Sequence, residues 1–257
     1  MSTKRRKKAH VVAVMLCLLC AAGCKGGNVG TVETGQQAHT MRQGLSRVNY
    51  LLFLPRAYSQ DPDKQWPLMV FLHGIAKRGR TLADLDLLKK DGPPMIVEEQ
   101  LDFPFIVLSP QCPPDSEWEP QLGKLEKLVD EVASTYAVDS DRIILTGLSL
   151  GGYGAWHWAL ESPDRFAALV PIAGGHVHGS DEVPDNICAI KDLPIWAFHG
   201  ASDDVVSPRQ SEVLVEALRA CGSDVQLTLY PGAAHDTSWK LAYADQDLYE
   251  WMLQQRR

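Results

Sequence analysis

Residues 143–154 read Ile143-Ile144-Leu145-Thr146-Gly147-Leu148-Ser149-Leu150-Gly151-Gly152-Tyr153-Gly154, and this segment carries the strongest structural signal in the chain. The apolar run that ends at Thr146 predicts a buried strand, and the pattern from Gly151 onward predicts a helix. Between them lies G-x-S-x-G, which places Ser149 on a sharp strand-to-helix turn. The neighbours two residues away must be small to avoid a clash, and the helix N-terminus favours developing negative charge. The segment therefore predicts a nucleophilic serine above the edge of a sheet.

Short apolar runs alternate with helical patterns on both sides of this segment. Buried strands are expected at residues 50–54, 68–72, 105–108, 143–145, 168–172, 195–198 and 225–229. Helices are expected at residues 81–90, 122–136, 151–161, 208–220 and 238–253. This alternation predicts a single α/β domain with a mostly parallel central sheet, helices on both faces and no separate lid domain.

A serine nucleophile needs a base, and the base needs an acid that orients it. Asp203 and Asp204 follow the expected strand at 195–198, and His235 follows the expected strand at 225–229. Because the carboxyl ends of parallel strands meet at one edge of a sheet, these side chains should lie near Ser149. The chain order of serine, then acid, then histidine predicts a catalytic triad in which Asp203 and Asp204 compete for the acidic position.

Four segments resemble the α/β-hydrolase superfamily: FLHG at 71–74, GLSLGG at 147–152, WAFHGASD at 196–203 and YPGAAHDTSW at 230–239. The nearest branch is that of secreted esterases related to polyhydroxybutyrate depolymerases and feruloyl esterases, often described as phospholipase/carboxylesterase or predicted peptidase. The resemblance covers residues 47–254 and implies an α/β-hydrolase fold. It also implies Asp203 as the acid, His235 as the base, and an oxyanion hole built from the backbone N–H groups of Leu150 and Ile75.

The loop after His73-Gly74, which carries Ile75, is called the oxyanion loop below. The chain departs from the esterase branch at the rim of this loop. The branch commonly has glycine and an acidic residue before Arg-Gly, whereas this chain has Ala76-Lys77-Arg78-Gly79. The departure changes the charge of the rim and leaves the substrate preference open. Two tryptophans near the expected site, Trp118 and Trp239, are candidates for the substrate pocket, and packing is the alternative role for each.

The remaining histidines are expected to be structural. We expect His73 to brace the oxyanion loop and His199 to form hydrogen bonds within a buried strand. His176 and His178 form an H-x-H pair without a third ligand at a suitable spacing, so a loop is favoured over a metal site. No metal and no organic cofactor is implied.

The N-terminal residues differ in character from the rest. A basic run at residues 4–8 and an apolar run at residues 11–22 precede Gly23-Cys24, which predicts a signal peptide over residues 1–23. Residues 21–24 also resemble a bacterial lipobox, with Ala21 where leucine is usual, so Cys24 is a candidate lipid anchor; plain secretion is the alternative. Residues 24–43 are predicted to be a flexible tether, and residues 44–257 to be the hydrolase domain. These features predict export to the bacterial cell envelope, the periplasm or the medium.

The composition excludes some classes of protein. The chain has 257 residues, 45% of them hydrophobic, and a net charge of −7; removing residues 1–23 removes five basic and no acidic residues and takes the charge to −12. An acidic domain of this size is unlike a nucleic-acid binder, and six cysteines are too few for a disulfide scaffold. Cys112, Cys188 and Cys221 follow Cys24, and Cys188–Cys221 is the expected bridge.

The sequence thus predicts a serine hydrolase that cleaves carboxylic esters through an acyl-enzyme. Its expected partner is an ester substrate, either a small molecule or an ester linked to a polysaccharide. Binding to nucleic acid is not expected, and contact with a membrane is expected only through the N-terminal lipid anchor. Two alternatives stay open: a serine peptidase of prolyl-oligopeptidase type, whose usual gating domain has no counterpart in this sequence, and a non-catalytic lipid-anchored binding protein on the same fold.

Overall fold

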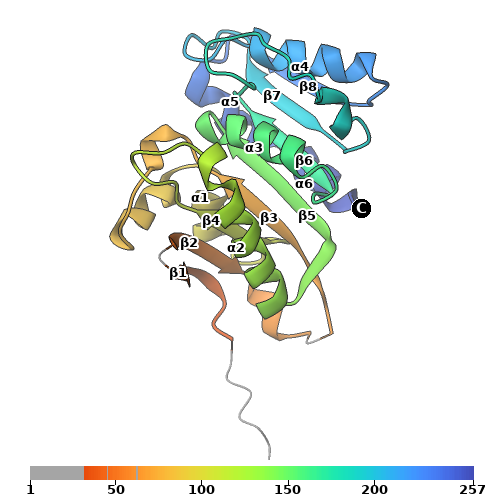
Figure 1. Ribbon diagram of the computed structural model, residues 1–257. Coiled ribbons are helices and arrows are strands. Elements are labelled where there is room, and N and C mark those ends of the chain that lie inside the picture. The colour runs from red at the N-terminus through yellow and green to blue at the C-terminus, as the bar shows by residue number, and fades with distance from the viewer. Residues whose placement is uncertain (1–31, 45, 62) are drawn as a thin grey trace, which may run out of the picture. The chain divides into compact units, whose positions relative to one another are not determined.

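The structure is a computed structural model that describes residues 32–44, 46–61 and 63–257 (Figure 1). The predicted signal peptide (residues 1–23) and the candidate anchor Cys24 lie outside the described residues. Within the described ranges, no helix is both long enough and apolar enough to cross a membrane. Residues 32–257 form one compact unit.

An eight-stranded sheet runs through the described residues in the order β1-β2-β4-β3-β5-β6-β7-β8. The strands are β1 Gly35–Gln43, β2 Ser46–Leu54, β3 Trp66–Leu72, β4 Ile106–Pro110, β5 Val138–Leu148, β6 Ala168–Ile172, β7 Trp196–Gly200 and β8 Gln226–Tyr230. Strand β2 pairs antiparallel with both β1 and β4, and every pairing from β4 to β8 is parallel. The predicted strands therefore all form, and the carboxyl ends of β3 to β8 lie along one edge. The strand expected at 225–229 is not buried as predicted, because β8 lies at the edge of the sheet and its residues are partly exposed.

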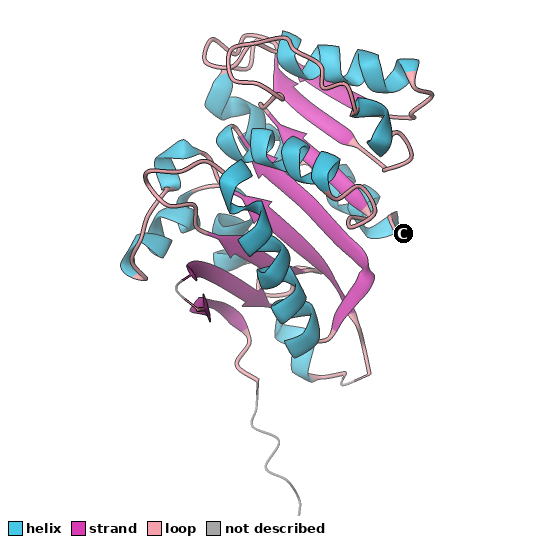
Figure 2. Ribbon diagram, viewed as in Figure 1, coloured by secondary structure: helices cyan, strands magenta, loops and turns pink. Residues whose placement is uncertain are grey.

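Helices cover both faces of the sheet (Figures 1 and 2). On one face, a single apolar cluster joins the sheet to α2 Leu122–Thr135, α3 Leu150–Glu161 and α4 Arg209–Ala220. On the other face, a second cluster includes α1 Gly92–Glu99, α5 His235–Ala244 and α6 Gln246–Gln254. Strand β3 supplies both clusters alternately, with Leu68, Val70 and Leu72 on one face and Met69 and Phe71 on the other, as expected for a strand buried on both sides.

The 3₁₀ segments are η1 Arg56–Ser59, η2 Ile75–Lys77, η3 Ala83–Lys90, η4 Glu119–Gln121 and η5 Ile187–Ile190. Two expected helices differ in the structure. The helix expected at 81–90 is the 3₁₀ segment η3, and α1 follows it. The helix expected at 238–253 is broken between α5 and α6 at Asp245, whose carboxylate caps α6 by accepting a hydrogen bond from the Asp247 N–H at 3.0 Å.

The predicted tether over residues 24–43 is wrong for residues 35–43, which form strand β1. This edge strand pairs with β2 along its whole length, so the backbone groups that face β2 are satisfied although its side chains are mostly polar. Met41 is buried, and the His39 ring stacks on the Tyr50 ring at a centroid distance of 5.3 Å. The domain therefore begins before residue 44.

The expected disulfide forms between Cys188 and Cys221, whose Cα atoms lie 5.6 Å apart. It joins η5 to the residue that follows α4. Cys112 is a buried free thiol, and burial raises its pKa to about 12. The Cys112 thiol is therefore uncharged at neutral pH and unsuited to act as a nucleophile.

Candidate active site

Ser149 occupies a strained turn between β5 and α3. Its backbone angles are φ 54° and ψ −120°, which a non-glycine residue rarely adopts. The Ser149 N–H donates to the Ile172 carbonyl at 2.9 Å and so ties the turn to the end of β6. A Cβ atom at Gly147 would collide with the Gly151 carbonyl, and one at Gly151 with the Leu72 carbonyl. Only glycine fits at these two positions, so the packing explains the G-x-S-x-G pattern.

The structure brings Ser149, His235 and Asp203 into one chain of hydrogen bonds. His235 Nε2 lies 2.9 Å from Ser149 Oγ, and His235 Nδ1 lies 2.6 Å from Asp203 Oδ2. A carboxylate only accepts hydrogen bonds, so the Nδ1–H donates to Asp203 and the lone pair on Nε2 faces the serine hydroxyl. This is the arrangement in which histidine can remove the serine proton.

Neighbouring loops hold the histidine and the aspartate in place. Asp203 lies in the loop after β7, and His235 is the first residue of α5, after β8. The loops are joined by two backbone hydrogen bonds, from the Ala201 N–H to Tyr230 O at 2.9 Å and from the Ser202 N–H to Ala233 O at 3.0 Å. These bonds fix the spacing between the two side chains independently of the side chains themselves.

The Asp203 carboxylate is fully buried and surrounded by donors. Its Oδ1 accepts from the Val205 and Val206 N–H groups at 3.0 and 2.9 Å, and its Oδ2 accepts from His235. Asp204, in contrast, is exposed. Of the two acids left open by the chain order, the structure places Asp203 against His235.

A second histidine contacts the same carboxylate, which the sequence did not predict. His199 Nε2 lies 3.2 Å from Asp203 Oδ2 and 3.0 Å from the Val206 carbonyl oxygen, and the His199 side chain is fully buried. Both neighbours are acceptors, so Nε2 carries the proton. Burial lowers the pKa of His199, which keeps the ring neutral. The available signal was position alone, because His199 stands four residues before Asp203 in the segment HGASD.

The expected oxyanion donors stand on two elements beside the serine. Leu150 begins α3 and Ile75 begins η2, and neither N–H has an acceptor within the described part of the chain. The two elements are in contact: a Cβ atom added at Gly74 would lie 3.5 Å from the Ser149 Cβ. A substrate oxygen that lay between these two elements could therefore accept hydrogen bonds from both N–H groups.

His73 and Trp118 hold the oxyanion loop in place through hydrogen bonds. His73 Nε2 accepts from the Cys112 N–H at 3.0 Å, which leaves Nδ1–H to donate to the Gly74 carbonyl at 2.7 Å. Trp118 Nε1–H donates to the His73 carbonyl at 3.0 Å, and its ring contacts the His73 ring edge-on. Burial lowers the pKa of His73 to about 4, so this histidine is neutral and has no free nitrogen for proton transfer.

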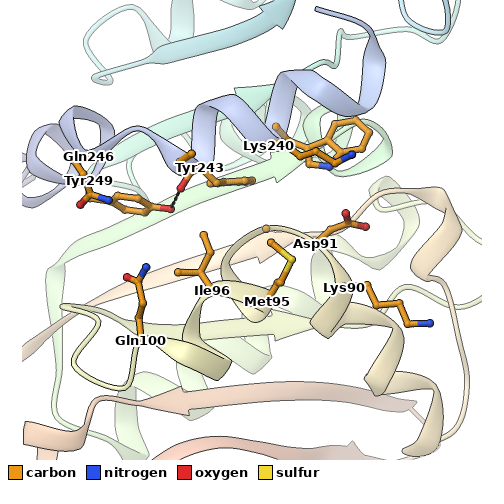
Figure 3. A pocket seen from close by; sticks show the side chains of 12 residues that line it. Lys90, Asp91, Met95, Ile96, Gln100, Lys240, Tyr243, Gln246 and Tyr249 are labelled. Carbon is orange, nitrogen blue, oxygen red and sulfur yellow. Dashed lines mark hydrogen bonds between the residues drawn. The ribbon is translucent and has the colours of Figure 1, made fainter.

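Two cavities lie next to these residues. One of about 240 Å³ is lined by Leu150 and Trp118 together with Glu117, Tyr153, His176 and His178. Trp118 lines this cavity, and its indole N–H donates to the His73 carbonyl. A second cavity of about 440 Å³ lies between α1 and the helices α5 and α6 (Figure 3), and Trp239 lines it while packing edge-on against the His235 ring at 5.1 Å.

The H-x-H pair takes part in packing contacts. His176 accepts a hydrogen bond through its carbonyl from His157 Nε2 at 2.8 Å, and the His178 ring packs on Tyr153. Among the residues that the structure describes, no group of three or more His, Cys, Asp or Glu side chains is arranged to hold a metal ion.

Several known proteins are similar to this chain in sequence. A sequence profile described as phospholipase/carboxylesterase matches residues 103–244. A bifunctional acetylxylan esterase/xylanase of Neocallimastix patriciarum is 29% identical over 105 residues, which cover 41% of this chain and 14% of that protein. An acyl-protein thioesterase 1 homolog 2 of Dictyostelium discoideum is 31% identical over 96 residues, which cover 37% of this chain and 42% of that protein.

Most of the chain is also similar to a solved structure. A thermostable esterase superposes with a TM-score of 0.72 and 33% identity, covering 87% of this chain and 64% of that one. The chain thus spans less than half of these two curated relatives and slightly under two thirds of the solved esterase.

Proposed function

The chain belongs to the phospholipase/carboxylesterase family of the α/β-hydrolase fold, which confirms the resemblance, and from this premise we propose that it is a serine esterase. It cleaves carboxylic esters in two steps through an acyl-enzyme on Ser149. The observation that carries the proposal is the continuous hydrogen-bond chain from Ser149 through His235 to the buried Asp203. A packing role for these three residues would not require a serine in a strained turn with its hydroxyl facing the basic nitrogen of a histidine.

In the first step, His235 Nε2 removes the proton of Ser149 Oγ as that oxygen attacks the ester carbonyl carbon. The carbonyl oxygen becomes negatively charged and accepts hydrogen bonds from the N–H groups of Leu150 and Ile75. The carbon–oxygen bond to the alcohol then breaks, and His235 returns the proton to the departing alcohol. The buried Asp203 carboxylate stabilises the positive charge that His235 carries in between.

In the second step, water takes the place of the alcohol. His235 removes a proton from the water as it attacks the acyl carbon, the same two N–H groups receive the oxyanion, and Ser149 leaves with the proton. The product is a free carboxylic acid. His235 carries out every proton transfer in the two steps, and water enters as the second substrate.

The direct experiment compares the wild-type protein with Ser149→Ala on a nitrophenyl acetate or butyrate. Replacement of a serine nucleophile in such a triad typically lowers kcat about a millionfold, so the variant should retain only background hydrolysis. Equal rates for the two proteins would remove Ser149 from the mechanism. A panel of simple acyl esters, a polyester, and acetyl or feruloyl esters of plant polysaccharide then identifies the preferred substrate class.

We also propose that the protein is exported and held at the cell envelope by a lipid on Cys24. The support is the basic and apolar pattern of residues 1–23 followed by Gly23-Cys24. Metabolic labelling with a radioactive fatty acid tests this: the wild-type chain should be labelled and Cys24→Ser should not. An unlabelled wild-type chain recovered in soluble form outside the cytoplasm would instead support plain secretion.

A further inference from the structure

The cavity of about 440 Å³ between α1 and the helices α5 and α6, called the groove below, borders the proposed triad at Trp239, whose ring contacts the His235 ring. Figure 3 shows α1 along one side and α5 and α6 along the other, with Asp91, Lys90 and Lys240 at one end and Gln100 and Gln246 at the other. Met95, Ile96 and Tyr243 lie between these ends. The groove is therefore apolar along its middle and polar at both ends.

Its apolar wall is fixed by hydrogen bonds that use up the tyrosine hydroxyls. The Tyr243 hydroxyl lies 2.8 Å from Thr146 Oγ1, and the Tyr249 hydroxyl donates to the Tyr243 carbonyl at 2.7 Å. Gly92, with φ +60°, starts α1 where a Cβ atom would lie 2.9 Å from the Phe71 ring. The wall that α5 and α6 contribute is thus formed by aromatic rings held in place by hydrogen bonds, opposite Met95 and Ile96 of α1.

The polar end with Asp91 is tied to the proposed site on two sides. Trp239 lines the groove and lies one helical turn after His235, with the two rings packed edge-on at 5.1 Å. Asp91 also lines the groove and forms an ion pair of 2.8 Å with Lys77, which follows Ile75 in the oxyanion loop. This end therefore lies between the helix that carries the base and the loop that carries an expected oxyanion donor.

A buried donor at this end lacks an acceptor. The Trp239 side chain is 9% exposed, and its Nε1–H has no hydrogen-bond acceptor among the described residues. Leaving a buried N–H unpaired is costly, so such groups usually meet a partner. A ligand in the groove that places an oxygen near Trp239 Nε1 would supply that acceptor.

From these observations we infer that the groove is a substrate subsite for an unbranched apolar chain whose ester group lies at the triad. The inference rests on the proposed esterase function. Helix α1 has eight residues, which at 1.5 Å per residue gives a groove wall of about 12 Å. This length accommodates a medium-chain group. The chain is either the acyl part or the alcohol part of the ester, and the two are chemically alike for the groove.

The test is to block the groove and compare long with short esters. Ala244 lines the groove and is exposed, so Ala244→Trp fills the groove without disturbing the core. The matched control is Ala220→Trp, which makes the same change at the exposed end of α4, away from the groove. Each protein is assayed on nitrophenyl acetate, butyrate and octanoate, which vary the acyl part, and on ethyl, butyl and octyl acetate, which vary the alcohol part.

Full burial of one methylene is worth about fourfold in kcat/KM, which corresponds to ~0.8 kcal/mol. Because the groove is open on one side, we expect wild type to prefer the octyl-length ester by about tenfold over the butyl-length ester in one of the two series. Ala244→Trp should lose that preference and keep its rate on the shortest ester, and Ala220→Trp should behave as wild type. The series that responds shows which part of the ester occupies the groove.

An unchanged ratio of long-chain to short-chain rates in both series for Ala244→Trp would overturn the subsite while leaving the esterase proposal intact. Wild-type protein that hydrolyses no ester, even the acetate, would instead overturn the esterase proposal and the subsite with it. The two failures are therefore distinguishable in the same experiment.

Discussion

Acidification should destabilise the folded domain through His73, a residue that takes no part in the proposed proton transfers. Its Nε2 accepts the Cys112 N–H and its Nδ1–H is donated to the Gly74 carbonyl. A proton added to Nε2 would face the Cys112 N–H and break that bond. The folded state therefore keeps His73 neutral, and burial lowers its pKa from 6.5 to about 4.

Proton linkage gives the sign and the size of the effect of pH on the free energy of unfolding. Between pH 6.5 and about 4 the unfolded chain binds a proton at His73 and the folded chain does not. The free energy of unfolding therefore falls as the pH falls, with a slope of about 1.4 kcal/mol per pH unit for one proton. Over the whole window the loss from His73 reaches about 3 kcal/mol, and above pH 6.5 His73 contributes no pH dependence.

Urea unfolding at a series of pH values measures this slope, and His73→Gln is the matched variant because glutamine can both donate and accept but does not titrate. The slope of the variant should be smaller than that of wild type by about one proton in this window. The other buried histidines contribute equally to both proteins. Identical slopes for wild type and His73→Gln would refute the assignment of a buried neutral His73.

Two further predictions concern the surroundings of the site, and a third concerns the disulfide. Asp203→Asn should lower kcat about ten-thousand-fold because the histidine loses the carboxylate that orients it, whereas Asp204→Asn should leave kcat unchanged; steady-state kinetics that showed the reverse would exchange the two roles. His199→Phe should lower kcat by about tenfold to a hundredfold with little change in KM, because the Asp203 carboxylate loses a donor, and an unchanged kcat would make His199 a packing residue only. The double change Cys188→Ala/Cys221→Ala should lower the free energy of unfolding by about 3 to 4 kcal/mol for a bridge that spans 33 residues, and coincident urea curves for the two proteins would contradict this value.

The fold was largely predictable because most of its strands are buried on both faces. Continuous apolar runs such as 68–72 and 168–172 have few other interpretations, and all of them form strands. Strand β1 was missed because an edge strand obtains its stability from backbone pairing with β2 and needs only one buried side chain, Met41. A polar, glycine-containing sequence is compatible with that environment and with a flexible tether alike.

The residues of the candidate site also differ in how far the sequence alone predicts them. Ser149 and His235 could be located from sequence because each follows a strand in a turn with a characteristic composition. The choice between Asp203 and Asp204 needed the structure, since only the backbone path after β7 decides which side chain is buried against His235. The contact between His199 and Asp203 and the groove along α1 depend on packing between distant elements, and no local pattern encodes either of them.

Covalent capture tests the central claim most directly, because an acyl-enzyme mechanism requires a serine that reacts as a nucleophile. A fluorophosphonate probe followed by peptide mass spectrometry should place a single adduct on Ser149 of the wild-type protein. Ser149→Ala should carry no adduct, and His235→Ala should react far more slowly because the base is missing. An unmodified wild-type protein, or equal labelling of wild type and Ser149→Ala, would contradict the account.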